Sequence, residues 1–155
     1  MREPKRPKQA SSRRAISAAY YGVFHLLTGE TAGLLLRGTK ARPLRTALAR
    51  AFSHSEMAAA SKSFGSGTMI DILARSVGTA SVPTDLRIVA AAFINLQKAR
   101  HEADYDLATS VSRQDARDLI GRARAAFQAW QRVKGTQEAI AYRVALLCHQ
   151  RLKQR

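Results

Sequence analysis

Apolar residues recur at intervals of three and four along most of this chain, which is the spacing that places side chains on one face of an α-helix. Glycine, proline, serine and threonine separate the periodic stretches. No stretch alternates between apolar and polar residues as a half-buried strand does. The pattern predicts an all-α, up-and-down bundle of four to five helices, with short helices between them.

The first helix is expected to follow a basic arm. Residues 1–10 hold two prolines and four basic side chains and almost nothing apolar, which predicts a flexible arm. Ser11 or Ser12 can cap the helix, and Gly29 is expected to end it. Its buried stripe is predicted to consist of Ile16, Ala19, Tyr20, Val23, Phe24 and Leu27.

A second helix is expected from Pro43, because proline suits the first turn of a helix. It is predicted to continue, with a kink at 53–55, toward Phe64. Its inner face would be formed by Leu44, Ala47, Leu48, Ala51 and Phe52. The glycines in the run 65–67 break the chain there, and this run lacks the lysine and the strand-to-helix context of a phosphate-binding P-loop.

The second half of the chain predicts a short helix around 70–73 and three longer ones. Thr84 begins a helix that leads into the densest polar cluster of the sequence, Ser112 and Asp115 are spaced as a capping box, and Thr136 caps the last helix. The last helix is expected to face inward through Ile140, Val144, Leu147 and Cys148, with Arg143, Arg151, Lys153 and Arg155 on its other side.

Domain boundaries follow from these elements. Residues 1–10 form the arm, residues 11–134 form the bundle, and residues 135–155 form an additional helix that packs on the bundle or on a partner. The single cysteine, Cys148, excludes an intramolecular disulfide and fits a reducing, cytoplasmic location. No apolar stretch approaches the length of a membrane span, so no membrane association is expected.

The charge is strongly positive and unevenly distributed. The chain has 26 Lys+Arg against 11 Asp+Glu, a formal net charge of +15, and the basic side chains are concentrated in 1–14 and 113–155. Such a surface attracts polyanions, which predicts RNA as a partner. A basic surface that only keeps the protein soluble is the alternative. DNA binding has no helix-turn-helix spacing to support it.

Residues 98–106 carry the densest functional chemistry. Arg100 and Asp104 are four residues apart on a helix and so share a face, and His101 and Tyr105 are four apart on its flank. An arginine that continues a buried stripe needs a partner, because an unpaired buried charge is costly. The cluster is therefore either an ion pair that fixes a helix end or part of a functional site.

Two stretches together resemble the HEPN superfamily, and more closely its short bacterial branch that is often encoded beside a minimal nucleotidyltransferase. Residues 19–25 show that branch's small-Tyr-Tyr-small-x-Phe-His pattern within an opening helix that starts at Ser12. Residues 100–105 show its Arg-x-x-Ala-Asp-Tyr signature. His54 also resembles a histidine of that branch. The resemblance covers residues 11–134.

The resemblance implies a helical bundle that pairs two-fold, so that both signature helices meet at a cleft. In the ribonuclease members of the family, an arginine and a histidine cleave RNA without a metal, through attack by the 2′-hydroxyl of the RNA itself. Arg100 matches the arginine, whereas Tyr105 stands in the place of the histidine. A phenol is a poor base at neutral pH. His101, His54 or His25 would have to substitute, or the protein binds RNA without cutting it.

The candidate site residues follow from the polar cluster and the resemblance. The catalytic candidates are Arg100, His101, Asp104, Tyr105 and His54, and the RNA-contacting candidates are Arg100, Lys98, Arg13 and Arg14. A partner nucleotidyltransferase would add AMP to Tyr105 or Tyr20, although either tyrosine could equally pack inside the bundle. No cofactor or metal is expected, because the carboxylates at 102–106 fit a solvated helix end more simply.

A non-catalytic helical module that partners a nucleotidyltransferase is the alternative function. His25 ends an apolar stripe, so a buried structural role is the expectation for it. His54, in a polar stretch, could equally be a helix-capping group.

Overall fold

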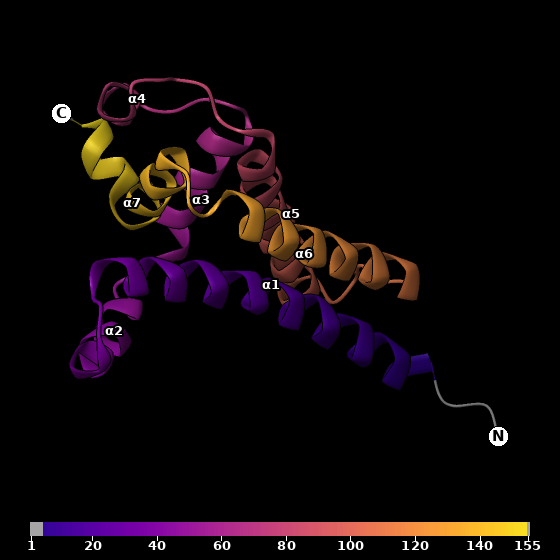
Figure 1. Cartoon of the computed structure of the whole chain (residues 1–155). Helices are drawn as coiled ribbons and strands as arrows, with labels where there is room; N and C mark the ends of the chain where they lie inside the picture. Colours follow the sequence, from indigo (N-terminus) through magenta and orange to yellow (C-terminus); the bar gives the residue numbers. More distant parts are fainter. Residues whose placement is uncertain (1–4, 155) are drawn as a thin grey trace.

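The computed structural model describes residues 5–154, and over these residues the chain folds into helices without strands (Figure 1). The elements are α1 (Lys5–Leu35), the 3-10 turn η1 (Thr39–Ala41), α2 (Arg42–Ala49), α3 (His54–Gly65), α4 (Asp71–Val77), α5 (Thr84–Tyr105), α6 (Arg113–Val133) and α7 (Gln137–Lys153). The predicted all-α bundle is confirmed.

The core lies where α1, α3, α5, α6 and α7 meet. The long helices α5 and α6 pack side by side and α1 crosses both, while α7 packs against α3 (Figure 1). The largest side chains that are fully removed from solvent are Trp130, Tyr20, Tyr142, Phe64 and Phe93. Burial of such side chains is the main favourable contribution to folding, at roughly 1.5–3 kcal/mol for each large apolar group. The C-terminal helix therefore packs on its own bundle.

Helix α1 is longer than predicted at both ends. Residues 5–10, expected to be part of an arm, are helical, and the amide of Gln9 accepts a bond from the backbone N–H of Val111 at 3.0 Å. Residues 1–4 lie outside the described part. Helix α1 also continues past Gly29, because Ala32 packs into the core about one turn later. The hydroxyl of Thr31 donates to the carbonyl of Leu27 at 2.7 Å within this extension.

The predicted helix from Pro43 to Phe64 is two helices. Proline occupies the first turn of α2 as predicted, but α2 ends at Ala49 and α3 begins at His54. Ser53 causes this break, since it is extended and its hydroxyl accepts the N–H of Glu56 at 3.2 Å as an N-cap. Helix α2 projects from the end of α1 and buries none of its residues (Figure 1). Of the predicted inner face, Phe52 in the connection to α3 is buried and Leu48 packs partly buried against the core, whereas Leu44, Ala47 and Ala51 are exposed, so that part of the prediction is wrong.

The connections of the second half follow the prediction. Helix α3 ends in the glycine-containing break, where Gly67 has a φ of +86°, a conformation that glycine adopts without strain. The short helix extends to Val77 as α4, and α5 starts at Thr84. Helix α6 has the complete capping box, in which Ser112 and Asp115 each bond the other's backbone N–H.

The buried face of α7 differs from the prediction by one position. Ala139, Tyr142, Ala145, Leu146 and His149 are buried, whereas Ile140, Val144, Leu147 and Cys148 are only partly covered. Tyr142 explains this rotation, because its hydroxyl bonds to the buried Ser61 of α3 at 2.8 Å. Arg143, predicted to lie on the solvent side, is buried as well. Within residues 5–154, no helix has the length and apolar character needed to cross a bilayer.

We predict that Ser112→Ala lowers the free energy of unfolding by about 1 kcal/mol, because the substitution leaves an N–H of the first turn of α6 without its acceptor. Urea denaturation followed by circular dichroism measures this. The matched control is Ser81→Ala, an exposed serine in the loop before α5, which should change stability by less than about 0.5 kcal/mol. Equal effects of the two substitutions would contradict the assigned cap.

Candidate functional site

Three helices bring the candidate residues together. Helix α1 contributes Tyr20 and Tyr21 from the first resembling stretch, α5 contributes Arg100 and Asp104 from the second, and α3 contributes His54, its first residue. The two stretches are about 80 residues apart in the sequence, and they meet because α1 packs along α5.

Arg100 lies at the centre of this cluster. Its Nε donates to the carboxylate of Asp104 at 3.0 Å, and the second oxygen of that carboxylate accepts the hydroxyl of Ser17 at 3.0 Å. Its guanidinium lies over the rings of Tyr20 and Tyr21, with 5.5 and 5.1 Å from Cζ to the ring centroids. The predicted pairing of Arg100 with Asp104 is present. The Arg100 side chain keeps 21% of its surface exposed, so the charge is oriented and still reaches solvent.

His54 is positioned by Tyr20 and Phe24. The hydroxyl of Tyr20 hydrogen-bonds to Nδ1 of His54, and the imidazole stacks on the ring of Phe24 with centroids 4.8 Å apart. Gln97 of α5 donates to the backbone carbonyl of His54 at 3.2 Å, which fixes the start of α3. Arg100 and His54 thus both contact Tyr20, whose ring is buried, while His54 itself remains exposed.

The surroundings change two pKa values in the cluster. Burial raises the pKa of Tyr20 to about 12, although the positive charge of Arg100 opposes that shift. Burial, and secondarily the charge of Arg100, holds the pKa of His54 below its usual value of 6.5. At neutral pH the tyrosine therefore keeps its proton and the imidazole is uncharged. An uncharged imidazole can accept a proton from a bound ligand. A guanidinium held nearby can stabilise the negative charge that the ligand then carries.

The other two candidate histidines, His25 and His101, and the second candidate tyrosine, Tyr105, lie at the surface. His101 and Tyr105 stack on the flank of α5, with ring centroids 4.8 Å apart, and Tyr105 is 68% exposed. Packing of Tyr105 inside the bundle is therefore ruled out, whereas Tyr20 is packed in this way. His25 is exposed against the ring of Tyr21, so the expectation of a buried structural histidine there is wrong. His54 follows the capping residue and does not itself cap α3.

The basic residues proposed to contact RNA differ in whether their side chains already bond to the protein itself. Arg13 donates to the carbonyls of Ala103, Asp106 (3.2 Å) and Thr109 (2.6 Å), so its guanidinium holds the end of α5 and the loop after it. Arg14 and Lys98 are exposed. A structural role is thus visible for Arg13, and contact with RNA stays a prediction for all three.

Sequence reasoning missed three polar contributors to the cluster. Ser17 and Tyr21 lie four residues apart on α1, and Gln97 lies three residues before Arg100 on α5. Polar residues three or four positions from a candidate residue share its helix face, and this spacing is the signal that could have found them. Within residues 5–154, no three side chains of the His, Cys, Asp and Glu types come together as metal ligands would.

Comparison with known proteins adds no relative. No protein-family model matches the chain, and neither a curated protein nor a solved structure matches it.

We predict that stability falls as the pH is lowered from about 6.5 toward 5, because His54 and His149 have pKa values below 6.5 in the folded protein. His149 is buried, and its Nδ1 has no hydrogen-bond partner. Below about pH 6.5 these histidines bind protons in the unfolded chain before they do so in the folded chain. The free energy of unfolding therefore decreases as the pH falls from about 6.5 through the lower pKa values of the folded protein. Urea denaturation at several pH values measures the slope.

His54→Gln should reduce this slope without abolishing it, since His149 still titrates. The carboxylates with lowered pKa, such as Asp85, lose their contribution only below about 3.8, so they do not contribute in this window. A free energy of unfolding that is constant between pH 7 and pH 5 would contradict the lowered pKa values of both imidazoles.

We also predict that Arg13→Met destabilises the protein by about 1–3 kcal/mol, because it removes the donor that three carbonyls share. The control is Arg14→Met, which removes the same charge from an exposed neighbouring position and should cost less than about 0.5 kcal/mol. Thermal denaturation of both variants makes the comparison, and a similar loss in both would show that the charge and not the bonding matters.

Proposed function

We propose that this protein is a HEPN-like, RNA-directed domain that binds RNA at Arg100 as a homodimer and cleaves it without a metal, in the manner of a toxin of a toxin-antitoxin or defence system. The observation that carries the proposal is that Arg100 and His54 both contact Tyr20, the guanidinium over its ring and the imidazole at its hydroxyl. The resemblance requires an arginine and a histidine together, and the sequence offers no histidine at its expected place.

Arg100 fits the role of the phosphate-binding group. Asp104 and the two tyrosine rings hold its guanidinium in one orientation, so little further ordering is needed when a phosphate approaches. A guanidinium forms paired, charge-assisted hydrogen bonds with a phosphate and stabilises the charge that develops on it. The net charge of +15 brings a polyanion to this surface at long range.

His54 fits the role of the group that moves a proton. When Nδ1–H donates to the hydroxyl of Tyr20, Nε2 carries the lone pair and can accept the proton of a ribose 2′-hydroxyl. The 2′-oxygen then forms a bond to the adjacent phosphorus as the bond to the 5′-oxygen breaks. The departing 5′-oxygen takes up a proton from water and Nε2 of His54 returns the accepted proton to water, which leaves a 2′,3′-cyclic phosphate and a free 5′-hydroxyl. Tyr20 is a positioning residue in this scheme.

The exposed end of α5 supports the pairing of two copies. Tyr105 and Leu107 are 68% and 82% exposed, an unusual amount for neighbouring large apolar side chains beside a polar cluster. The two-fold cleft that the resemblance implies would cover this end. Tyr105 is also the more accessible of the two tyrosines proposed as targets of a nucleotidyltransferase, because Tyr20 is fully buried.

A second function is favoured by the contacts of Arg100 themselves. The network of Arg100, Asp104 and Ser17 joins α1 to the last turn of α5 and would serve equally as a structural pin. In that case the protein is a non-catalytic helical module that partners a nucleotidyltransferase. The two functions predict different effects of substituting Arg100: a loss of RNA affinity in a folded protein for the first, and a loss of stability for the second.

We predict that Arg100→Gln leaves the fold intact and lowers RNA affinity by about tenfold, with a smaller dependence of affinity on salt, because one phosphate contact is lost. Fluorescence anisotropy with a labelled single-stranded RNA in EDTA measures binding, and gel analysis measures cleavage. The matched control is Arg122→Gln, which removes one charge from an exposed position of α6 and should change affinity much less.

His54→Gln should retain binding and lose cleavage, since glutamine keeps a polar contact but does not titrate. If Arg100→Gln instead unfolds the protein, or binds RNA as well as the wild type, the structural-pin function is supported. If the wild type binds RNA in EDTA and never cleaves it, the catalytic part of the proposal is wrong and the binding part stands.

A further inference from the structure

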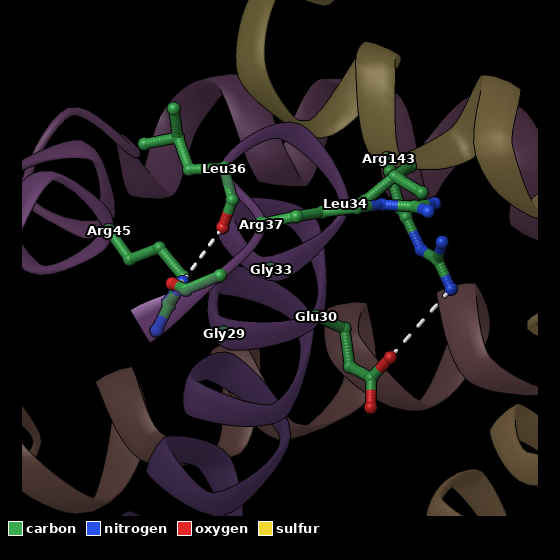
Figure 2. Close-up of a pocket in the computed structure, with 9 residues that line it drawn as sticks. Gly29, Glu30, Gly33, Leu34, Leu36, Arg37, Arg45 and Arg143 are labelled. Carbon is green, nitrogen blue, oxygen red and sulfur yellow. Dashed lines mark hydrogen bonds and ion pairs between the residues drawn. The ribbon is translucent and has the colours of Figure 1, made fainter. Parts of the chain in front are cut away.

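A pocket of about 540 Å³ lies at the opposite end of α1 from its N-terminus, between the turn into α2 and helix α7 (Figure 2). Gly29 and Gly33 of α1 border it together with Glu30, Arg37, Arg45 and Arg143. The residues of the Arg100 cluster do not line it. Three arginines and one carboxylate therefore face a space that the proposed RNA site does not use.

Arg143 is a buried cation with an incomplete set of partners. It is only 6% exposed, and its guanidinium lies over the ring of Trp130 at 4.8 Å. One terminal nitrogen donates to the carbonyl of Lys134 at 3.0 Å and forms an ion pair with the carboxylate of Glu30 at 3.7 Å, which is longer than a hydrogen bond (Figure 2). Its Nε is buried without any partner. A buried guanidinium in this state is costly unless an anion completes its bonding.

Arg45 is held in place by the backbone. Its Nη1 donates to the carbonyls of Leu36 at 2.9 Å and Gly38 at 2.7 Å, and the first of these bonds is drawn in Figure 2. Both bonds use the same nitrogen, which leaves Nη2 and Nε of the fork for another acceptor. Arg37 is exposed at the rim. Since Glu30 is the one carboxylate among the lining residues, the pocket has a net positive charge.

The glycines of α1 create the space. Gly29 and Gly33 are one turn apart on the same face of the helix, and a Cβ added at either position would meet no atom within 4 Å. The pocket thus occupies the volume that two side chains would otherwise fill. This offers a way to block it without disturbing the packing of α1.

We propose that this pocket binds a phosphomonoester, with Arg143 and Arg45 bonding the phosphate group and Arg37 closing the rim. A guanidinium matches the geometry of phosphate oxygens, and two or three of them outweigh the repulsion from Glu30. The volume exceeds that of a bare phosphate and lies in the range of small-molecule sites, so the ligand carries an organic group as well.

The test uses the full chain and its one tryptophan, Trp130, which stacks on Arg143 and so reports on an anion bound there. Inorganic phosphate and glycerol 3-phosphate are titrated separately against sodium chloride of equal ionic strength, and tryptophan emission and Tm are recorded. We expect a saturable change with both phosphates and tighter binding of the ester. No saturable response beyond that to chloride would overturn the proposal.

Two variants place the binding in the pocket. Arg37→Gln should weaken binding of glycerol 3-phosphate by about tenfold, the loss of one charge-assisted contact, whereas Arg50→Gln, at an exposed position just after α2 and outside the pocket, should not. Gly33→Leu should abolish binding while Tm stays equal or rises, because the new side chain fills the pocket and favours the helix. Retained binding in a folded Gly33→Leu protein, or equal losses in the two arginine variants, would reject the site.

The result is separable from the proposed function. Gly33→Leu leaves the net charge and the Arg100 cluster unchanged, so it should retain RNA binding whether or not the pocket binds phosphate.

Discussion

The burial of Tyr20 is the constraint on which the candidate site depends. The ring lies where α1, α3 and α5 converge, packed against Phe93 with centroids 5.5 Å apart and fully removed from solvent. Its hydroxyl must then bond within the protein, and His54 is the partner. One aromatic side chain thus connects the core to the surface histidine, and the guanidinium of Arg100 lies over the same ring. Packing and polar chemistry are therefore inseparable here.

The two ends of α1 serve different purposes in this arrangement. Its middle and first half pack on α5 and α6 through large side chains, whereas its last turns are rich in glycine and leave α2 and α7 apart. Positive charge gathers at both places, but it is compensated in different ways. Arg100 has a carboxylate at hydrogen-bonding distance, whereas the ion pair of Arg143 with Glu30, at 3.7 Å, is longer than a hydrogen bond.

Local signals in the sequence predicted most of the fold. The capping box at Ser112, the threonine cap of α7 and the breaks near Gly67 were found because each depends on residues within a few positions. The rotation of α7 was not, because Tyr142 and Ser61 are distant in the sequence and only packing joins them. In the candidate site, spacing predicted the pairing of Arg100 with Asp104. No local pattern shows that the start of α3 brings His54 next to Tyr20.

Helix α7 is interrupted near its end, and the interruption ties the chain terminus to the candidate site. Cys148 has non-helical angles (φ −149°, ψ 31°), and the N–H of Gln150 after it donates at 3.0 Å to the carboxylate of Glu56. Glu56 lies in the first turn of α3, two residues after His54. The C-terminal segment is thereby anchored by the same helical turn that presents the imidazole. One turn of helix thus carries both the candidate imidazole and the carboxylate that holds the last turns of α7 against α3.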